Sequence, residues 1–433
     1  MAEPTYTMPR GMKDIEPDEM AKRIWVNNKI MEVFKKYGFQ IVEPTPIESL
    51  ETLEAKCGPA IRDEIYWFKD KSGRNLGLRF DLTVGMARMV ANRYDLPIPI
   101  KIGAISGMWR YDEPQFGRYR HFYQWDAEIF GSEESAADAE AVALGMDILE
   151  NFGLKEYEVR ASSRKLVDSL LARTGIISPE ILERTIVTID KVRKIPEQEI
   201  IEEFKRIGLA EDKIKQIIDF ASMKGKPDSI LAELSRKIPE ENRQGLDELS
   251  EFFEVLGAFK KTGKCILDLS VVRGIGYYDG IVFEAYDKGG EDIGAIFGGG
   301  RYDKLCRLYG KQDLPATGVA GGIERLMMSL ERAGLLPELP QTPKVAVIAV
   351  TDEVRKKAFE IAQYIRSKGI SADVDLRKRS LKKQLEYADA MKIPYAIILG
   401  PEELKKGTVK LRDMKKRLET ETKIEEIPQQ LSK

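Results

Sequence analysis

The sequence predicts an α+β chain of several domains, and three observations support this. At 433 residues the chain is too long for one ordinary hydrophobic core, which favours two or three domains. Strand-like alternation of apolar and polar residues occurs on both sides of a charged, helical stretch at about residues 177–252. After the proline-rich stretch LLPELPQTPK, apolar strands alternate with helices, which is typical of a separate α/β domain.

The bulk composition is that of a globular protein without a dominant charge. The chain is 43% hydrophobic and 32% charged, with a net charge of -2, so a polyanion site would have to be a local patch. We expect a cytoplasmic protein, because the N-terminus has no apolar signal core and no apolar run reaches the length of a membrane span. The three cysteines match no disulfide or zinc spacing, and a single histidine argues against a Ser-His-Asp triad or a His-rich metal site.

The first part of the chain contains helix and strand signals in turn. Residues 18–37 have the apolar spacing of a helix that ends at Gly38. FQIVEPTPIES looks like a strand interrupted by Pro44 and Pro46, which suits an edge or an interface. NLGLRFDLTV is expected to be a strand, and GMWRYDEPQFGRYRHFYQWDAEIFG two strands around a loop. The expected domains are a catalytic domain at 1–176 and 253–332, a helical insertion at 177–252, a linker at 333–343 and an α/β domain at 344–433.

The stretch RYRHFYQWDAEIFG places Phe122, Gln124, Asp126 and Glu128 on one face of a strand. The polar face of an antiparallel strand usually meets water. Here, however, an aromatic ring shares that face with acceptor groups, and lysines are absent from it. A binding face is therefore the better interpretation.

Two neighbouring segments carry charges at alternate positions as well. MWRYD places Met108, Arg110 and Asp112 together, and LRFDLT does the same for Arg79, Asp81 and Thr83. Three such strands could line one cleft floor with both signs of charge. Such a cleft would suit a zwitterionic ligand beside an anionic one.

Two further arginines stand next to glycines. Arg273 lies in VVRGIGYYDG, where a turn with a surface arginine is the simpler explanation for this piece alone. Arg325 falls in the first turn of a helix after GVAGG, where the helix dipole disfavours a cation, so an anion or a planar ring is expected nearby. The arginines, carboxylates and tyrosines, without a convincing nucleophile, suit phosphoryl or nucleotidyl transfer by positioning and charge stabilisation.

Together these segments resemble a known family. GFQIVEPTPIE, WRYDEPQFGRYRHFYQWDAEIFG and GVAGGIERLMMSL resemble motifs 1, 2 and 3 of class II aminoacyl-tRNA synthetases. RGIGYYDGIVFE and FGGGRYDKL resemble the signature stretches of the histidyl-tRNA synthetase family, LRFDLT its amino-acid-binding loop, and the C-terminal region its anticodon-binding domain. The resemblance implies an α+β catalytic domain on an antiparallel sheet, a helical insertion and a C-terminal α/β anticodon-binding domain.

The resemblance also implies roles on the ATP side of the site. Arg110 would bind the α-phosphate of ATP and the substrate carboxylate, and Arg273 would neutralise the α-phosphate as charge develops. Phe122 and Arg325 would enclose the adenine ring, and Asp112 would lie near it. Mg²⁺ would accompany ATP, with no metal ligand assigned to a protein side chain.

On the amino-acid side, the resemblance implies a pocket for histidine. Asp81, Thr83 and Gln124 would hold the α-amino group, while Glu128 and Tyr278 would read the imidazole nitrogens. The remaining histidine-binding residues implied by the family are Arg273, Tyr277 and Tyr302. The chain departs from the family's usual RGLDYY at Gly276, and Asp279 stands where threonine is common.

The resemblance implies a homodimer and tRNA(His) as a substrate. Pro46 would lie at the dimer interface. Residues 377–417 hold 13 Lys/Arg against 5 Asp/Glu, a net charge of +8 that could simply belong to a solvated face. In a domain of this kind it predicts a tRNA-binding patch. The candidates are Arg377, Lys378, Arg379, Lys382 and Lys383.

Two other functions are compatible with parts of the pattern. A catalytically inactive paralogue, such as the histidyl-tRNA-synthetase-like regulatory subunit of ATP phosphoribosyltransferase, would share the fold. Such proteins usually lack the anticodon-binding domain and parts of RG…YY, whereas this chain has both. An RNA-binding accessory protein would leave the acidic pocket unexplained.

Overall fold

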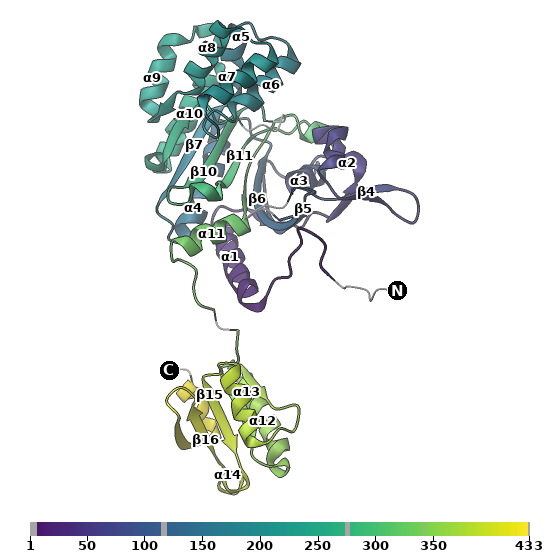
Figure 1. Ribbon diagram of the computed structural model, residues 1–433, viewed down its shortest axis with the longest axis vertical. Helices are drawn as coiled ribbons and strands as arrows, with labels where there is room; N and C mark the ends of the chain where they lie inside the picture. The colour runs from purple at the N-terminus through teal and green to yellow at the C-terminus, as the bar shows by residue number, and fades with distance from the viewer. Residues whose placement is uncertain (1–6, 114–118, 273–277, 340, 432–433) are drawn as a thin grey trace. The chain divides into compact units, whose positions relative to one another are not determined.

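The computed structural model describes residues 7–113, 119–272, 278–339 and 341–431. The chain forms two compact units, Met1–Pro337 and Glu338–Lys433 (Figure 1). None of the described helices is both long enough and apolar enough to cross a lipid bilayer.

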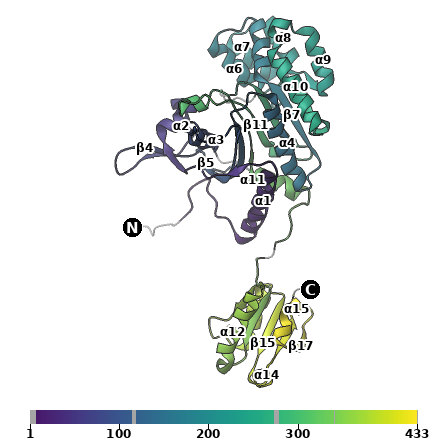
Figure 2. The same ribbon diagram turned by 180° about the vertical axis from the view of Figure 1, so that it is seen from behind.

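The first unit is built on a nine-stranded sheet with the order β1-β5-β6-β12-β11-β10-β7-β9-β8. Its strands β5, β7 and β11 can be found in Figures 1 and 2. Its middle is antiparallel from β5 to β7, whereas β1 pairs with β5 and β7 pairs with β9 in parallel. The expected antiparallel sheet is thus confirmed at its centre, with a parallel pair toward each end. The strands are β1 (Gln40–Ile41), β5 (Ile100–Trp109), β6 (His121–Phe130), β7 (Tyr157–Ser163), β8 (Lys224–Gly225), β9 (Cys265–Asp268), β10 (Ile281–Asp287), β11 (Ala295–Arg301) and β12 (Ala316–Gly322).

The alternation in β6 divides its side chains between two faces of this sheet. Trp125, Ala127 and Ile129 belong to the largest buried apolar cluster, together with residues of the helices that cover that face. Those helices are α1 (Pro17–Lys36), α4 (Ser135–Asn151), α10 (Gln244–Ala258) and α11 (Ile323–Arg332). Because strand side chains alternate, the residues between these three face the other side, where the polar positions of β6 lie.

The proline-containing stretch near the N-terminus forms two short strands instead of one. β1 is an edge of the large sheet, and β2 (Ile47–Ser49) is an edge of a three-stranded sheet with the order β2-β4-β3. The prolines therefore interrupt a strand as expected. The other members of this region are α2 (Leu50–Cys57), β3 (Trp67–Lys69), β4 (Asn75–Leu78) and α3 (Thr83–Val90).

The prediction of a single strand over NLGLRFDLTV is wrong for the second half of this stretch. β4 ends at Leu78, and α3 begins at Thr83. The Oδ1 atom of Asp81 accepts a hydrogen bond from the backbone N–H of Val84 at 3.0 Å. This carboxylate satisfies a backbone donor in the first turn of α3 and so favours a helix start over strand continuation.

The helical stretch packs into two different apolar clusters. Side chains of α5 (Arg164–Arg173), α6 (Pro179–Ile189), α7 (Glu197–Ile207) and α8 (Glu211–Ala221) surround one core that also includes Val272. Side chains of α9 (Pro227–Lys237) and α10 join the main core beneath the sheet. The boundaries 177 and 252 remain a prediction. α5 contributes to both clusters, because Val167 and Leu171 belong to the first and Leu166 belongs to the main core.

The second unit has the expected alternation of strands and helices. β13 (Val345–Ala349) pairs in parallel with β14 (Ala372–Val374) and β15 (Tyr395–Leu399), and α12 (Arg355–Ser367) and α13 (Leu381–Ala390) connect them. An antiparallel extension follows that the sequence pattern did not indicate. It consists of β16 (Thr408–Asp413) and β17 (Leu418–Lys423), while α14 (Pro401–Lys406) and α15 (Ile427–Leu431) complete the unit.

Candidate active site

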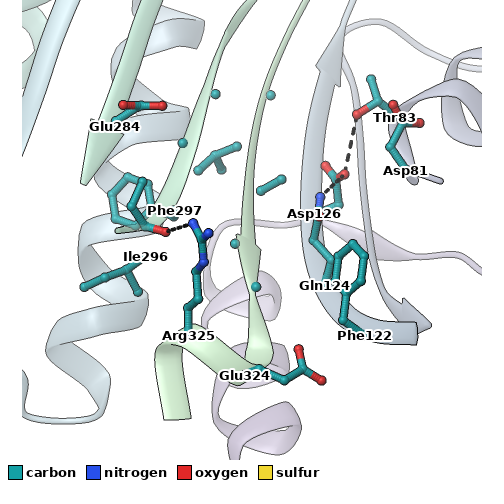
Figure 3. Close-up of a pocket in the computed structure, with 18 of the residues that line it drawn as sticks. Asp81, Thr83, Phe122, Gln124, Asp126, Glu284, Ile296, Phe297, Glu324 and Arg325 are labelled. Atoms are coloured by element: carbon teal, nitrogen blue, oxygen red, sulfur yellow. Dashed lines mark hydrogen bonds between the residues drawn. The ribbon is translucent and has the colours of Figure 1, made fainter. Parts of the chain in front are cut away.

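A cavity of about 340 Å³ lies on the polar face of the large sheet (Figure 3). It is lined by residues of β6, β11, β12 and α11 and by the segment before α3. Every ATP-binding and histidine-binding candidate among the described residues lines it. They are Asp81, Thr83, Arg110, Asp112, Phe122, Gln124, Glu128, Tyr278, Tyr302 and Arg325.

The wall formed by β6 changes in character along its length. Phe122 and Gln124 are half-buried, whereas Asp126 and Glu128 are buried, at 0% and 2% exposure. Figure 3 shows Phe122, Gln124 and Asp126 projecting from one strand toward the cavity. A solvated face is therefore excluded for this part of β6, because buried carboxylates require partners or ligands.

Glu128 is held by its neighbours across the sheet. The hydroxyl of Tyr302 donates a hydrogen bond to Oε2 of Glu128. Gly318 lies opposite Glu128 in the register of β12 and β6, and a Cβ at that glycine would stand 1.5 Å from Oε2. Glycine is thus required here for space. The candidate set missed Gly318, and the sequence offered only a glycine-rich strand as a signal.

Burial perturbs the two carboxyls of this wall. It raises the pKa of Glu128 to about 7, against the opposing effects of hydrogen bonds from Tyr302, Asp126 and Thr83 and of the Lys56 charge. Burial also raises the pKa of Asp126 well above its usual value, and the adjacent Glu128 raises it further. Two coupled carboxyls with raised pKa values in a cavity are typical of a functional site.

Asp81 and Thr83, at the start of α3, line the cavity beside Asp126, and an unexpected cation, Lys56 of α2, lies next to Asp81. The Nζ atom of Lys56 lies 2.6 Å from Oδ2 of Asp81, and only 1% of the lysine side chain is exposed. Sequence reasoning missed Lys56, which stands in the short helix α2 among acidic residues. Arg79, expected on the same floor, lies outside the cavity lining. Its guanidinium instead binds the backbone carbonyl of Gly107 and other groups.

The other end of the cavity contains two arginines and an aromatic ring. The guanidinium carbon of Arg110 lies 5.0 Å from the centroid of the Phe122 ring, and its Nε donates to the carbonyl of Phe80 at 3.0 Å. Arg325 donates from Nη1 to the carbonyl of Ala295 at 3.2 Å, in the first turn of α11 (Figure 3). Both signs of charge thus line one cavity, which agrees with the expectation from the alternating charges.

Next to Arg325, Glu324 connects the cavity to α1. One carboxylate oxygen accepts from Nη2 of Arg23 at 3.0 Å, and the backbone N–H of Tyr123 lies 3.1 Å from each oxygen. Arg23 is itself buried, with its guanidinium carbon 4.4 Å from the Tyr123 ring. These contacts join α1, β6 and α11 at the arginine end of the cavity.

Part of the signature stretch is described and part is not. Arg273, Gly276 and Tyr277 lie outside the described residues. Tyr278 is buried, with its ring centroid 6.4 Å from that of Tyr302. The carboxylate of Asp279 accepts a hydrogen bond from the backbone N–H of Asp303 at 3.1 Å, so this departure from the family pattern has a structural use.

The candidates for tRNA and dimer contacts lie elsewhere. Arg377, Lys378, Lys382 and Lys383 are exposed in the second unit. Arg379 is half-buried, and its guanidinium carbon lies 4.3 Å from the centroid of the Tyr387 ring. Pro46 is exposed between β1 and β2 in the first unit. Among the described residues, no group of three or more His, Cys, Asp or Glu side chains is arranged to hold a metal ion.

Comparison with known proteins identifies the family. A family model described as histidyl-tRNA synthetase matches residues 11–326, and one described as anticodon binding domain matches residues 344–433. The chain is 39% identical over 426 residues to a histidine–tRNA ligase from Thermococcus kodakarensis, covering 96% of this chain and 97% of the relative. It is 37% identical to a histidine–tRNA ligase from Pyrococcus furiosus, covering 96% of each.

Solved structures of similar proteins agree with this family assignment. The histidyl-tRNA synthetase from Nostoc sp. superimposes with a TM-score of 0.83 at 26% identity, covering 99% of both chains. A Bacillus halodurans protein described as an ATP phosphoribosyltransferase regulatory subunit/histidyl-tRNA synthetase shares the fold, with a TM-score of 0.76 at 24% identity. The family models and the relatives covering nearly the whole chain therefore show that this chain belongs to the histidyl-tRNA synthetase family, the ATP-dependent ligases of class II.

Proposed function

We propose that this protein activates histidine with ATP and transfers the histidyl group to the 3′ end of tRNA(His), using the cavity on the large sheet. The observation that carries the proposal is the division of that cavity. Buried acceptor groups around Glu128 lie at one end, and Arg110 and Arg325 lie with Phe122 at the other. A zwitterionic amino acid and an anionic nucleotide require such a division.

In the first step a carboxylate oxygen of histidine attacks the α-phosphorus of ATP. A new P–O bond forms, the bond to the β-phosphate oxygen breaks, and pyrophosphate leaves, giving histidyl-adenylate. Arg110 and Arg273 stabilise the negative charge on the α-phosphate oxygens, a role for which guanidinium groups are suited. Mg²⁺ enters with ATP as part of the nucleotide substrate.

In the second step a hydroxyl of the terminal ribose of tRNA attacks the acyl carbon of the adenylate. The ester bond to tRNA forms, the mixed-anhydride bond breaks, and AMP leaves with the electron pair. The hydroxyl proton passes to a phosphate oxygen of the leaving group or to water. Holding both reactants in place supplies much of the rate in such a reaction.

Recognition of histidine depends on the imidazole slot. Glu128 accepts from one ring N–H, while Tyr302, bonded to the same carboxylate, fixes its orientation. Tyr278, which lines the same cavity, reads the other ring nitrogen, and Tyr302 completes the pocket. A buried acceptor left without its partner is unfavourable, so amino acids lacking a ring N–H are rejected strongly.

We assign the other partners as follows. The exposed basic residues of 377–417 bind phosphates of tRNA, since this segment carries a net charge of +8. The stretch around Pro46 lies at a two-fold interface of a homodimer. A cytoplasmic location fits the need for ATP and tRNA.

The alternative function, an inactive regulatory subunit of ATP phosphoribosyltransferase, is not better supported than the ligase. The Bacillus halodurans protein that bears that description also bears the synthetase description, and its identity of 24% shows the fold alone. The anticodon-binding match and the acceptor groups that line the described part of the cavity favour the ligase.

Exchange of labelled pyrophosphate into ATP tests the proposal. The full-length protein should support exchange with histidine and with no other amino acid, and should then charge tRNA with labelled histidine. Arg273→Ala should reduce exchange by orders of magnitude while the thermal unfolding midpoint stays unchanged. A protein that binds histidine but never exchanges pyrophosphate would be a regulatory subunit, and near-normal exchange in the variant would remove Arg273 from the mechanism.

A further inference from the structure

Asp126 is a buried carboxyl in the cavity wall to which neither the motif pattern nor the proposed function gives a role. It lines the cavity with 0% exposure, between Gln124 and Glu128 on the same face of β6. No hydrogen-bond donor among the described residues reaches its Oδ1 atom. A buried carboxylate oxygen without a donor is unfavourable, which indicates that a ligand supplies the donor.

The neighbours of Asp126 on the adjacent strands offer neither a hydrogen-bond donor nor a positive charge to its carboxyl group. Ala104 on β5 and Ala320 on β12 are its register partners. Alanine side chains leave open the space in front of the carboxyl and carry neither charge nor donor. The two strands beside β6 thus supply no donor to Asp126, whose carboxyl neighbour on the same strand is Glu128.

Asp81, the carboxylate expected to bind the α-ammonium group, is already engaged. Its Oδ1 accepts the backbone N–H of Val84 at 3.0 Å, and its Oδ2 lies 2.6 Å from Nζ of the buried Lys56. An incoming ammonium group would have to share or displace these donors. Asp126 lies nearby, and its Oδ1 receives no hydrogen bond from the described residues.

The position of Asp126 indicates which part of histidine it meets. Its Oδ2 lies 3.4 Å from Nε2 of Gln124 and 3.5 Å from Oγ1 of Thr83, two of the residues expected around the amino group (Figure 3). Glu128, in contrast, is bonded to Tyr302 at the imidazole end. We infer that Asp126 is an additional histidine-binding residue, which accepts a hydrogen bond from the α-ammonium group through Oδ1.

This inference rests on the proposed function. It also predicts that a proton leaves the site when the ligand binds. Burial and the neighbouring Glu128 raise the pKa of Asp126, Asp81 acts in the same direction, and Lys56 opposes them. The empty pocket therefore holds a proton on the Asp126–Glu128 pair, and an ammonium ion beside Asp126 lowers that pKa again. Binding of the ligand releases the proton to solvent, so affinity rises with pH.

A pair of ligands that differ only in the amino group tests the assignment. Histidinol carries the ammonium group, and 3-(imidazol-4-yl)propan-1-ol lacks it. We would measure both dissociation constants by calorimetry on the full-length protein, for the wild type and Asp126→Asn. The variant should bind histidinol about 10-fold or more weakly, since a charge-assisted hydrogen bond is lost, and bind the propanol within about 2-fold of the wild type.

Proton release provides a readout that a purely structural role would not change. Calorimetry in two buffers of different ionisation enthalpy should show proton release with histidinol for the wild type and less for Asp126→Asn. The matched control is Asp287→Asn. Asp287 is equally buried on β10, but it pairs with Arg332 and does not line the cavity. Its variant should leave the ratio of the two dissociation constants unchanged.

The outcomes separate the two proposals. Equal weakening of both ligands in Asp126→Asn, or an unchanged histidinol constant, would overturn the role of Asp126. A wild type that binds neither ligand and shows no histidine-dependent pyrophosphate exchange would overturn the proposed function itself. A wild type that exchanges pyrophosphate normally, with a ligand ratio insensitive to Asp126, would overturn only the further inference.

Discussion

The hydroxyl of Tyr302 donates a hydrogen bond to the buried carboxylate of Glu128, although the two residues lie 174 positions apart in the chain. Glu128 is on β6, and Tyr302 directly follows β11. In the sheet, β12 lies between β6 and β11, so the hydrogen bond spans an intervening strand. Gly318 on β12 leaves the room in which the two side chains meet. The acceptor for the imidazole is thus fixed before any ligand binds, which reduces the free energy needed to order the site.

Gly318→Ala tests this geometry. The added methyl group would lie 1.5 Å from Oε2 of Glu128, so the carboxylate must move away from Tyr302 and from the imidazole position. We expect histidine-dependent pyrophosphate exchange to fall by about 100-fold or more, which corresponds to about 3 kcal/mol of lost transition-state stabilisation. Steady-state exchange kinetics check this.

The matched control is Gly257→Ala in α10, where the nearest atom to an added Cβ is 3.8 Å away on Thr262. Alanine should stabilise that helix by about 0.5–1 kcal/mol and leave exchange unchanged. If Gly318→Ala retained the wild-type KM for histidine, the carboxylate would not be fixed by the space at Gly318.

Glu128→Gln should make the protein more stable at alkaline pH. Burial raises the pKa of Glu128 to about 7, so the folded state holds a proton that the unfolded state has released above about pH 4.5. Stability that is present below that pH is lost as pH rises toward 7. A glutamine side chain does not titrate in this range. The free energy of unfolding of the variant should therefore exceed that of the wild type by about 1–3 kcal/mol at pH 8 and differ little from it at pH 4.5, measured by urea denaturation.

The same substitution should impair histidine selection. The KM for histidine should rise by about 10-fold or more, whereas the KM for ATP changes little, because only the imidazole contact is lost. Stability and function would then change in opposite directions, as is common for buried charges at active sites. An unchanged KM for histidine would remove Glu128 from the pocket.

Arg193 connects the helical cluster of α5–α8 to the large sheet. Its Nε lies 3.0 Å from Oδ2 of the fully buried Asp268 on β9, and its Nη2 donates to the carbonyl of Ser222 after α8. Arg193→Ala leaves Asp268 without this partner. It should cost about 1–3 kcal/mol, less than for a fully buried pair because a third of the arginine side chain is exposed.

Hydrogen exchange measures this effect locally. Amides of α6–α8 should exchange faster in Arg193→Ala than in the wild type, while those of α12 should not change. Arg206→Ala is the control, since that arginine is exposed and its contact with Glu202 spans 3.7 Å. Equal protection of α6–α8 in both variants would show that the apolar cluster alone holds these helices.

Charge reversal at Lys382 and Lys383 tests the basic segment. Each lysine that contacts a phosphate contributes about one unit to the slope of log affinity against log salt concentration. The double variant with glutamate should bind tRNA more weakly and with a smaller salt slope, measured by filter binding. Lys356→Glu, on α12 and outside residues 377–417, is the control, and an equal loss there would contradict a localised patch.

Short-range patterns predicted much of the fold. The apolar period of α1, the alternation in β6 and the βαβαβ order of the second unit all follow from the spacing of side chains. The strand expected over MWRYD was only partly right, because β5 ends at Trp109, before Arg110 and Asp112. The start of α3 was missed because Asp81 was interpreted as a strand residue, whereas its carboxylate binds a backbone N–H in the first turn of the helix. β16 and β17 were missed because their charged alternation has too little apolar content.

The cavity shows a different limit of sequence reasoning. Glu128 and Gln124 were predicted because alternation places them on one face with an aromatic ring. Lys56 was not, since it resembles a surface lysine of a charged helix until the fold brings it next to Asp81, 25 positions along the chain. Gly318 was also missed, because only the register with Glu128 reveals why a side chain is excluded.

A crystal structure of the protein with histidine and a non-hydrolysable ATP analogue tests the central claim most directly, namely that one cavity holds both substrates. We expect the imidazole within hydrogen-bond distance of Glu128 and the adenine between Phe122 and Arg325, with the α-phosphate next to Arg110. Histidine bound away from Glu128, or a nucleotide in a separate cavity from Arg110 and Arg325, would contradict it.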